Sequence, residues 1–184
     1  MGMVMENSFN VPAAPEQVWQ YFQDFKKVAD CAPGAELTGQ SGNQVEGKVA
    51  VKMGPVKLGF KGKVDIVERN DAAKRMVLNA SGGETSGKGQ ATAKVTMQIT
   101  PSGNGSTVKV TQDINMSGAV AQFGRGMMQD VTGVMMKQFA DCVAAGIRGG
   151  GRAPTGGPKA LSGFSLMLIS IKSFFKRLFG GGRK

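Results

Sequence analysis

Apolar side chains recur at every second position through much of the N-terminal two thirds of the chain, which is the period of a half-buried β-strand. Turn residues interrupt this alternation at Asn70-Asp71, around Gly82-Gly83 and at 102–106. The pattern predicts strands at 4–11, 46–53, 57–67, 75–80, 90–99 and 107–116. Strands joined by short turns pair as an antiparallel sheet with one face covered.

Three other segments follow the period of an amphipathic helix. The first two are predicted at 15–25 and 26–31, the second ending before Pro33-Gly34. The third runs from about 119 to 146, and a helical wheel places its apolar side chains on one half. That half carries Met127, Met128, Val131, Val134, Met135, Phe139, Cys142 and Val143. We expect this long helix to cover the concave face of the sheet, which makes the fold α+β.

The inward positions of the predicted strands combine small and flexible residues. Gly47, Gly62, Ala91 and Ala93 would widen the space beneath the helix, and Met53, Met76, Met97 and Met116 would line it. Methionine is more often core filler, but a wide gap under one helix favours an apolar pocket. The predicted ligand-binding residues are Trp19, Phe22, Met53, Phe60, Met97, Gln112, Met116, Phe123, Met127, Val131 and Met135.

Gln112 is the one amide on the inward face of its strand. Because buried polar groups need partners, its side chain bonds either to a neighbouring backbone group or water, or to a ligand carbonyl or hydroxyl. The sequence leaves both interpretations open.

Catalytic groups are scarce. The chain has no histidine, which excludes Ser–His and Cys–His pairs and histidine metal sites, and its strand carboxylates fall on the outward phase. We therefore predict a binding protein with no metal and no catalytic residue. Cys31 and Cys142 lack metal-ligand spacing, and we expect two thiols in a reducing compartment rather than a disulfide. No secretory signal is recognised, so the predicted location is cytoplasmic.

Charge is distributed unevenly. Eight of the 23 basic residues and none of the 13 acidic residues follow Asp141. Residues 147–160 are rich in Gly, Pro and basic residues, as in a flexible linker. The sequence therefore predicts a domain at 1–146, a linker at 147–160 and a tail at 161–184. Nucleic-acid binding is not expected, because the body lacks aromatic residues interleaved with Lys or Arg.

The tail has the pattern of a helix that lies in a membrane interface. Its apolar run is far shorter than the roughly 20 residues of a spanning helix, and its apolar side chains occupy an arc of about 140° opposite Ser, Lys and Arg. The residues predicted to contact an anionic membrane are Phe164, Leu168, Ile171, Lys172, Phe175, Lys176, Arg177 and Leu178. The alternative is that the tail packs on its own domain or on a partner protein.

Four stretches together resemble the CoxG family of carbon monoxide dehydrogenase subunits, within the START/Bet v 1-like (SRPBCC) superfamily. They are CAPG (31–34), VKMGPVKLGFKG (51–62), GKGQATAKV (87–95) and AQFGRGMM (121–128). The resemblance implies a helix-grip fold, with a curved seven-stranded antiparallel sheet wrapped on a long C-terminal helix. It also implies a ligand cavity, a membrane-attaching tail and an accessory role for a molybdenum hydroxylase-type or other respiratory oxidoreductase.

These features lead to one functional hypothesis and three alternatives. The hypothesis is a protein peripheral on the inner face of the cell membrane, which binds a respiratory quinone (menaquinone or ubiquinone) and links an oxidoreductase such as molybdenum CO dehydrogenase to electron transport. The alternatives are a ligand-free adaptor that recruits the enzyme, a general lipid carrier, and a cyclase-like enzyme.

Overall fold

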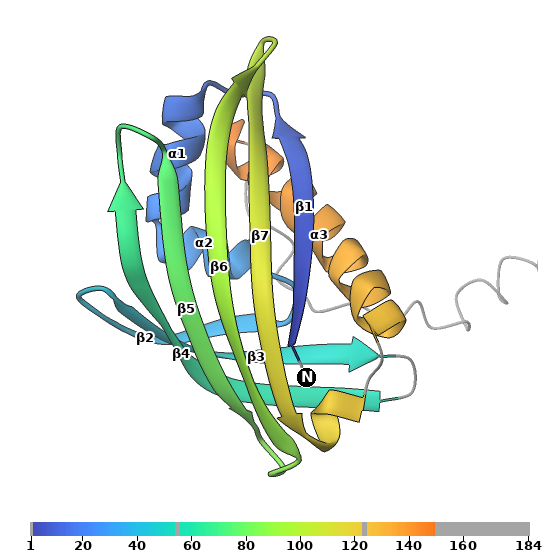
Figure 1. Cartoon of the computed structure of the whole chain (residues 1–184). Coiled ribbons are helices and arrows are strands. Elements are labelled where there is room, and N and C mark those ends of the chain that lie inside the picture. The colour runs from blue at the N-terminus through green and yellow to red at the C-terminus, as the bar shows by residue number, and fades with distance from the viewer. Residues whose placement is uncertain (1, 54–55, 123–124, 150–184) are drawn as a thin grey trace, which may run out of the picture.

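The protein forms one strongly bent antiparallel sheet with its helices on one face (Figure 1). The structure is a computed structural model that describes residues 2–53, 56–122 and 125–149. In chain order its elements are β1 (Gly2–Val11), α1 (Pro15–Gln23), α2 (Phe25–Cys31), β2 (Ala35–Ser41), β3 (Gln44–Met53), β4 (Val56–Asn70), β5 (Arg75–Glu84), β6 (Gly89–Ser102), β7 (Gly105–Gly118), the 3₁₀ helix η1 (Ala119–Gln122) and α3 (Arg125–Ile147).

The seven strands lie in the order β1-β7-β6-β5-β4-β3-β2. In Figure 1, β1, β7 and β6 run upright, whereas β3 crosses beneath them at a steep angle. The sheet therefore curls around the space that the helices cover. The predicted helix-grip architecture is confirmed.

All six strands that the alternation predicts are present, and each is longer than predicted. The alternation did not predict the seventh strand, β2, because Leu37 is its single large apolar residue. The turn predicted around Gly82-Gly83 was wrong, because both glycines pair within β5. Glycines resemble a turn in sequence, but here they let two strands approach closely.

The long C-terminal helix differs from its prediction in two ways. Its first residues form η1, and α3 begins at Arg125. Val134, predicted on the covering face, is 60% exposed. The helix is rotated so that Met136, which the wheel did not place on that half, joins the predicted Phe139 and Val143 in the core. The ring of Phe139 fixes this rotation by packing against Phe9 and Phe22, at centroid distances of 6.1 and 6.0 Å.

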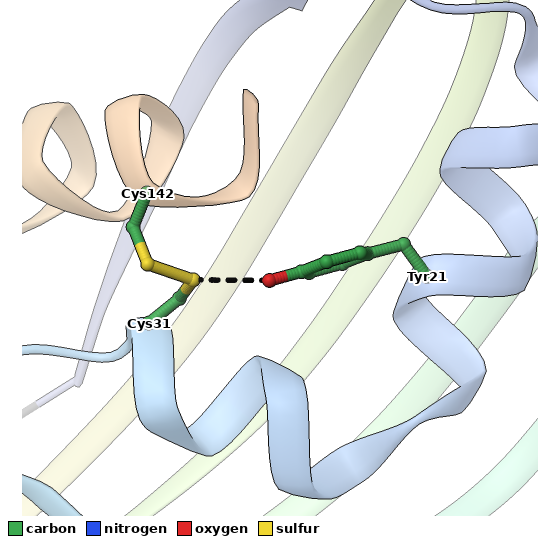
Figure 2. Close-up of a disulfide and its surroundings, with 3 residues drawn as sticks. All are labelled: Tyr21, Cys31 and Cys142. Atoms are coloured by element: carbon green, nitrogen blue, oxygen red, sulfur yellow. Dashed lines mark hydrogen bonds between the residues drawn. A yellow bond between two sulfur atoms is a disulfide. The ribbon is translucent and has the colours of Figure 1, made fainter. Parts of the chain in front are cut away.

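The prediction of two free thiols was wrong. Cys31, at the end of α2, forms a disulfide with Cys142 of α3, and the two Cα atoms lie 5.4 Å apart (Figure 2). The hydroxyl of Tyr21 donates a hydrogen bond to the sulfur of Cys31 at 3.2 Å. Burial raises the pKa of this hydroxyl. Spacing along the chain could not reveal the bond, because only the packing of α2 against α3 brings the two cysteines together.

Candidate ligand-binding cavity

A cavity of about 400 Å³ lies between the sheet and the helices α2 and α3. Six strands contribute to its wall, and the helices contribute Ala29 of α2 and Met128 of α3. The lining residues are Ala29, Ala35, Glu36, Leu37, Val45, Glu46, Gly47, Lys48, Val49, Phe60, Gly62, Lys63, Val64, Ala80, Ser81, Gly82, Ala91, Thr92, Ala93, Ile114, Met116 and Met128.

The strand register divides the sheet side of the cavity into two rows. One row, which we call the glycine row, consists of Gly47, Gly62, Gly82 and Ala91 on four adjacent strands, each paired with the next. The second row is built in the same way from Val45, Val64, Ala80, Ala93 and Ile114. All nine residues line the cavity, so the space exists because most of their side chains are absent or small.

Larger apolar side chains border the glycine row. Met116 pairs with Ala91 and so continues the row onto β7. Val49 and Phe60 are paired with each other and lie two residues along their strands from Gly47 and Gly62. Four of the small residues that alternation placed inward, Gly47, Gly62, Ala91 and Ala93, all line the cavity.

Only part of the predicted ligand-binding set lies at this cavity. Phe60 and Met116 line it. Val131 packs in the adjoining apolar cluster, which also contains Phe60 and Met116. Met135 is half-buried and belongs neither to the lining nor to the two buried clusters. The side chains of Met53 and Met127, and all of Phe123, lie outside the described part of the chain.

Three of the predicted ligand-binding residues instead fill the core. Trp19, Phe22 and Met97 are at most 6% exposed and pack together at the other end of the sheet. The indole N–H of Trp19 donates to Asp71 Oδ1 at 2.8 Å, and this bond lowers the pKa of the Asp71 carboxyl. Their helical and inward positions were predicted correctly, but the pattern could not tell filled core from cavity wall.

Gln112 faces inward but does not line the cavity. It pairs with Val95 of β6, one row beyond Ala93 and Ile114. It is half-buried, and its side chain makes no hydrogen bond to another described residue. The residue therefore lies between the cavity and the filled core.

The sequence reasoning missed Gly82 and Ala80, which are the contributions of β5 to the glycine row and to the second row. The predicted strand stopped at Ala80 because the next glycines resembled a turn. Extending the alternation past Ala80 would have placed Gly82 inward. The alternation of β5 thus continues through Gly82, although two consecutive glycines are typical of a strand end.

One carboxylate is buried at the edge of the cavity region. Glu84, 8% exposed, ends β5 and pairs with Phe60. Its Oε2 accepts the Ser86 hydroxyl at 2.6 Å and the backbone N–H groups of Ser86 and Lys88 at 2.9 and 3.1 Å. The Ser86 hydrogen bond lowers the pKa of Glu84 most. The carboxylate is thus occupied in shaping the β5–β6 turn.

A second hollow, of about 320 Å³, lies between α1 and the β2–β3 hairpin. Its rim carries Gln23, Glu68 and Arg69. Arg69 donates to Gln23, and Arg75 donates to Glu68. These polar groups already bond within the protein, so the apolar cavity is the better candidate site.

The described residues offer neither a metal site nor a helix that could span a membrane. No group of three or more His, Cys, Asp or Glu side chains among them could hold a metal ion. Within residues 2–53, 56–122 and 125–149, no helix combines the length and apolar character needed to cross a bilayer. The predicted membrane-contacting residues, Phe164 to Leu178, lie outside the described part.

Solved structures share this fold at low sequence identity. A conserved protein from Geobacillus kaustophilus matches with a TM-score of 0.71 and 17% identity, covering 80% of this chain and 96% of its own. An aromatase/cyclase from a Streptomyces species has a TM-score of 0.58 and 12% identity, covering 80% and 94%. Norcoclaurine synthase from Thalictrum flavum has a TM-score of 0.53 and 14% identity, covering 80% and 94%.

These identities establish the fold and no activity. No curated protein matches the chain at a significant level. The sequence model of CoxG, a family described as a carbon monoxide dehydrogenase subunit, however, matches residues 8–148. This range includes every strand of the sheet in whole or in part and all of α3. The chain therefore belongs to the CoxG family of carbon monoxide dehydrogenase subunits.

Proposed function

We propose that this protein binds a respiratory quinone, menaquinone or ubiquinone, in the cavity above the glycine row and serves a CO dehydrogenase at the membrane. The observation that carries the proposal is the cavity itself. Its sheet side is built from backbone, alanine, valine and isoleucine, with Phe60 and two methionines beside them. The charged and hydroxyl residues of the lining alternate with these inward residues along their strands; they are Glu36, Glu46, Lys48, Lys63, Ser81 and Thr92. The inward wall therefore favours an apolar ligand, because a polar ligand group would recover few of the hydrogen bonds it loses from water.

The volume limits how much of the ligand is enclosed. About 400 Å³ lies near the lower end of small-molecule pockets, which span roughly 300–1,000 Å³. A quinone ring with a short part of its isoprenoid chain fits this space, and the rest of the chain must extend outside. A ligand that is only partly enclosed can be exchanged with a bilayer.

Family membership supports the partner. The family is described as a subunit of carbon monoxide dehydrogenase, so we propose that the domain docks on such an oxidoreductase, the molybdenum enzyme being the first candidate. A non-catalytic role follows from the accessory nature of a subunit of this kind. Two of the structural neighbours are enzymes, but at 12% and 14% identity they share the fold alone.

Membrane attachment by residues 161–184 completes the proposal. Lys172, Lys176 and Arg177 would each contribute about 1 kcal/mol near an anionic leaflet, and the apolar face with Phe164 and Phe175 would add burial energy. The tail would thus hold the cavity near the quinone pool through reversible binding to the inner face of the cell membrane.

Extraction of the natively purified full chain tests the ligand. The protein is expressed in a quinone-containing bacterium, extracted with organic solvent, and the extract is analysed by mass spectrometry. We expect a quinone at close to one molecule per chain. A phospholipid or fatty acid in its place would make the protein a general lipid carrier. An empty extract, with no uptake after incubation with menaquinone or ubiquinone, would leave a ligand-free adaptor.

Deletion of residues 161–184 tests the anchor. The full chain should sediment with vesicles that contain phosphatidylglycerol and much less with pure phosphatidylcholine, and the shortened chain should sediment with neither. The matched variant replaces Lys172, Lys176 and Arg177 by Glu in the full chain and should lose the preference for the anionic lipid. Vesicle binding that persists after deletion would contradict the anchor.

A further inference from the structure

One part of the cavity wall, the glycine row, consists of backbone with almost no side chains. The apolar character of the cavity alone does not explain this. Where the lining of an apolar pocket is usually built from branched and aromatic side chains, the glycine row offers three glycines and one alanine on four adjacent strands. We propose that this row binds a flat ring system, face down on the peptide backbone. The inference rests on the proposed function, because it assigns the ring of the bound quinone to this row.

The dimensions of the row suit a ring system. Its four residues span three interstrand spacings, about 14 Å at about 4.8 Å each. Val49 and Phe60 stand along one side of it, and Val64 stands along the other, each two residues from a glycine of the row. The result is a shallow trough that runs across the strands, with Met116 of β7 at one end.

The bend of the sheet explains only part of the row. A Cβ atom on Gly62 would lie 2.0 Å from the carbonyl oxygen of Ser81, and one on Gly47 would lie 2.9 Å from that of Glu36, so glycine is required at both positions for the strands to approach. A Cβ atom on Gly82 would lie 3.2 Å from the Lys61 oxygen, a tight contact that requires a shift of a few tenths of an ångström. Ala91 already carries a Cβ atom. Close approach of the backbone therefore demands glycine at Gly47 and Gly62, and it does not by itself account for Gly82 and Ala91.

A ring uses such a surface better than a chain does. Every atom of a flat ring can contact the backbone at about 3.5–4.0 Å, and a rigid ring loses no internal rotation on binding. A flexible isoprenoid chain gains less, because it can follow gaps between ordinary side chains and must be ordered to do so. Glu84, the one buried carboxylate among the described residues, is bonded to Ser86 and Lys88. The charged residues of the lining, Glu36, Glu46, Lys48 and Lys63, fall on the outward phase of their strands, so the row suits an uncharged ring.

Two inward substitutions and one outward control test the proposal in the full chain. Gly82→Ala and Ala91→Val add carbon atoms to the row, whereas Gly83→Ala adds one to the opposite face, where a Cβ atom meets nothing within 4 Å. The probes are 2-methyl-1,4-naphthoquinone, which is a ring without a chain, and geranylgeraniol, which is a chain without a ring. Binding is measured by equilibrium dialysis, and folding by the thermal melt of Trp19 fluorescence.

We expect the inward variants to bind the naphthoquinone about tenfold more weakly, since overpacking costs roughly 1–3 kcal/mol. Geranylgeraniol binding by the inward variants should change by less than about twofold, and so should the binding of either probe by Gly83→Ala. Unchanged naphthoquinone binding in a folded inward variant, or equal loss of both probes, would overturn the ring assignment while leaving quinone binding intact. A wild-type chain that binds neither probe would refute the proposed function together with the inference.

Discussion

The two ends of the concave face are built from the same strands, but one end is filled with side chains and the other is hollow. Near the β4–β5 turn, β5 and β6 present Met76 and Met97, which are 2% and 5% exposed inside a filled core. Further along, the same two strands present Gly82 and Ala91 to a cavity. One sheet thus combines a packed half with a hollow half.

This difference indicates where the stability and the binding function reside. In the packed half Trp19, Phe22 and Phe139 interlock, and truncating any one of them leaves a void. In the hollow half the residues are already small, so little packing energy is present to lose. Changes in the packed half should affect the free energy of unfolding, and changes in the hollow half should affect ligand binding.

The largest expected effect is Phe22→Ala in the packed half. Phe22 is 6% exposed and touches the rings of Tyr21 and Phe139. We expect a loss of about 4 kcal/mol in the free energy of unfolding, from the range for buried aromatic truncations. Urea denaturation measures it. Quinone binding by the folded fraction should be unchanged, and a selective loss of binding would show that the two halves are coupled.

Removing the disulfide should have the next largest effect. Cys31 and Cys142 close a loop with a sequence separation of 111, and we expect Cys31→Ala with Cys142→Ala to cost about 3 kcal/mol. The urea midpoint of the double variant is compared with that of the wild type with and without reductant. A wild-type midpoint that does not change when reductant is added would contradict the disulfide and support the two free thiols that the sequence predicts.

Filling the hollow half should stabilise the protein. Ala93→Leu projects into the cavity, and we expect a gain of about 1 kcal/mol together with weaker quinone binding. The control Lys94→Leu, on the opposite face of β6, should change stability by less than about 0.5 kcal/mol. A large destabilisation by Ala93→Leu would mean that other side chains already fill this space.

Acid should weaken the turn beside the cavity. The hydrogen bond from Ser86 holds the pKa of Glu84 below its ordinary value of 4.5. A carboxyl group with a lowered folded-state pKa stabilises the fold above its unfolded pKa, and this stabilisation is lost as the pH falls through the folded value. In urea titrations from pH 7 to pH 3, Glu84→Gln should therefore lose less stability than the wild type. Parallel curves would contradict this role.

The smallest expected effect is that of Gln112→Leu. Gln112 lies four residues along β7 from Met116 at the end of the glycine row, about 13 Å at strand spacing. A ring on that row is out of its reach, so quinone affinity should change by less than about twofold. A large loss would place the ring carbonyl at Gln112 and move the ring away from the glycine row.

Periodicity alone predicted much of the fold, because strands and helices expose their apolar faces with different repeats. Gly47, Gly62, Ala91 and Ala93 were placed inward by alternation, and all four line the cavity. The residue types also excluded histidine chemistry before any fold was known. The same alternation placed Met97 and Met116 inward without distinction, although the first lies in filled core and the second at the cavity.

Only the tertiary structure made that distinction, because a cavity depends on what lies opposite a residue. The register aligned Gly62 with Gly82 and so joined isolated small residues into one row. The rotation of α3 brought Met136 to the core and left Val134 exposed. The packing of α2 against α3 brought Cys31 to Cys142. Each result depends on contacts between segments far apart in the chain, which local periodicity does not encode.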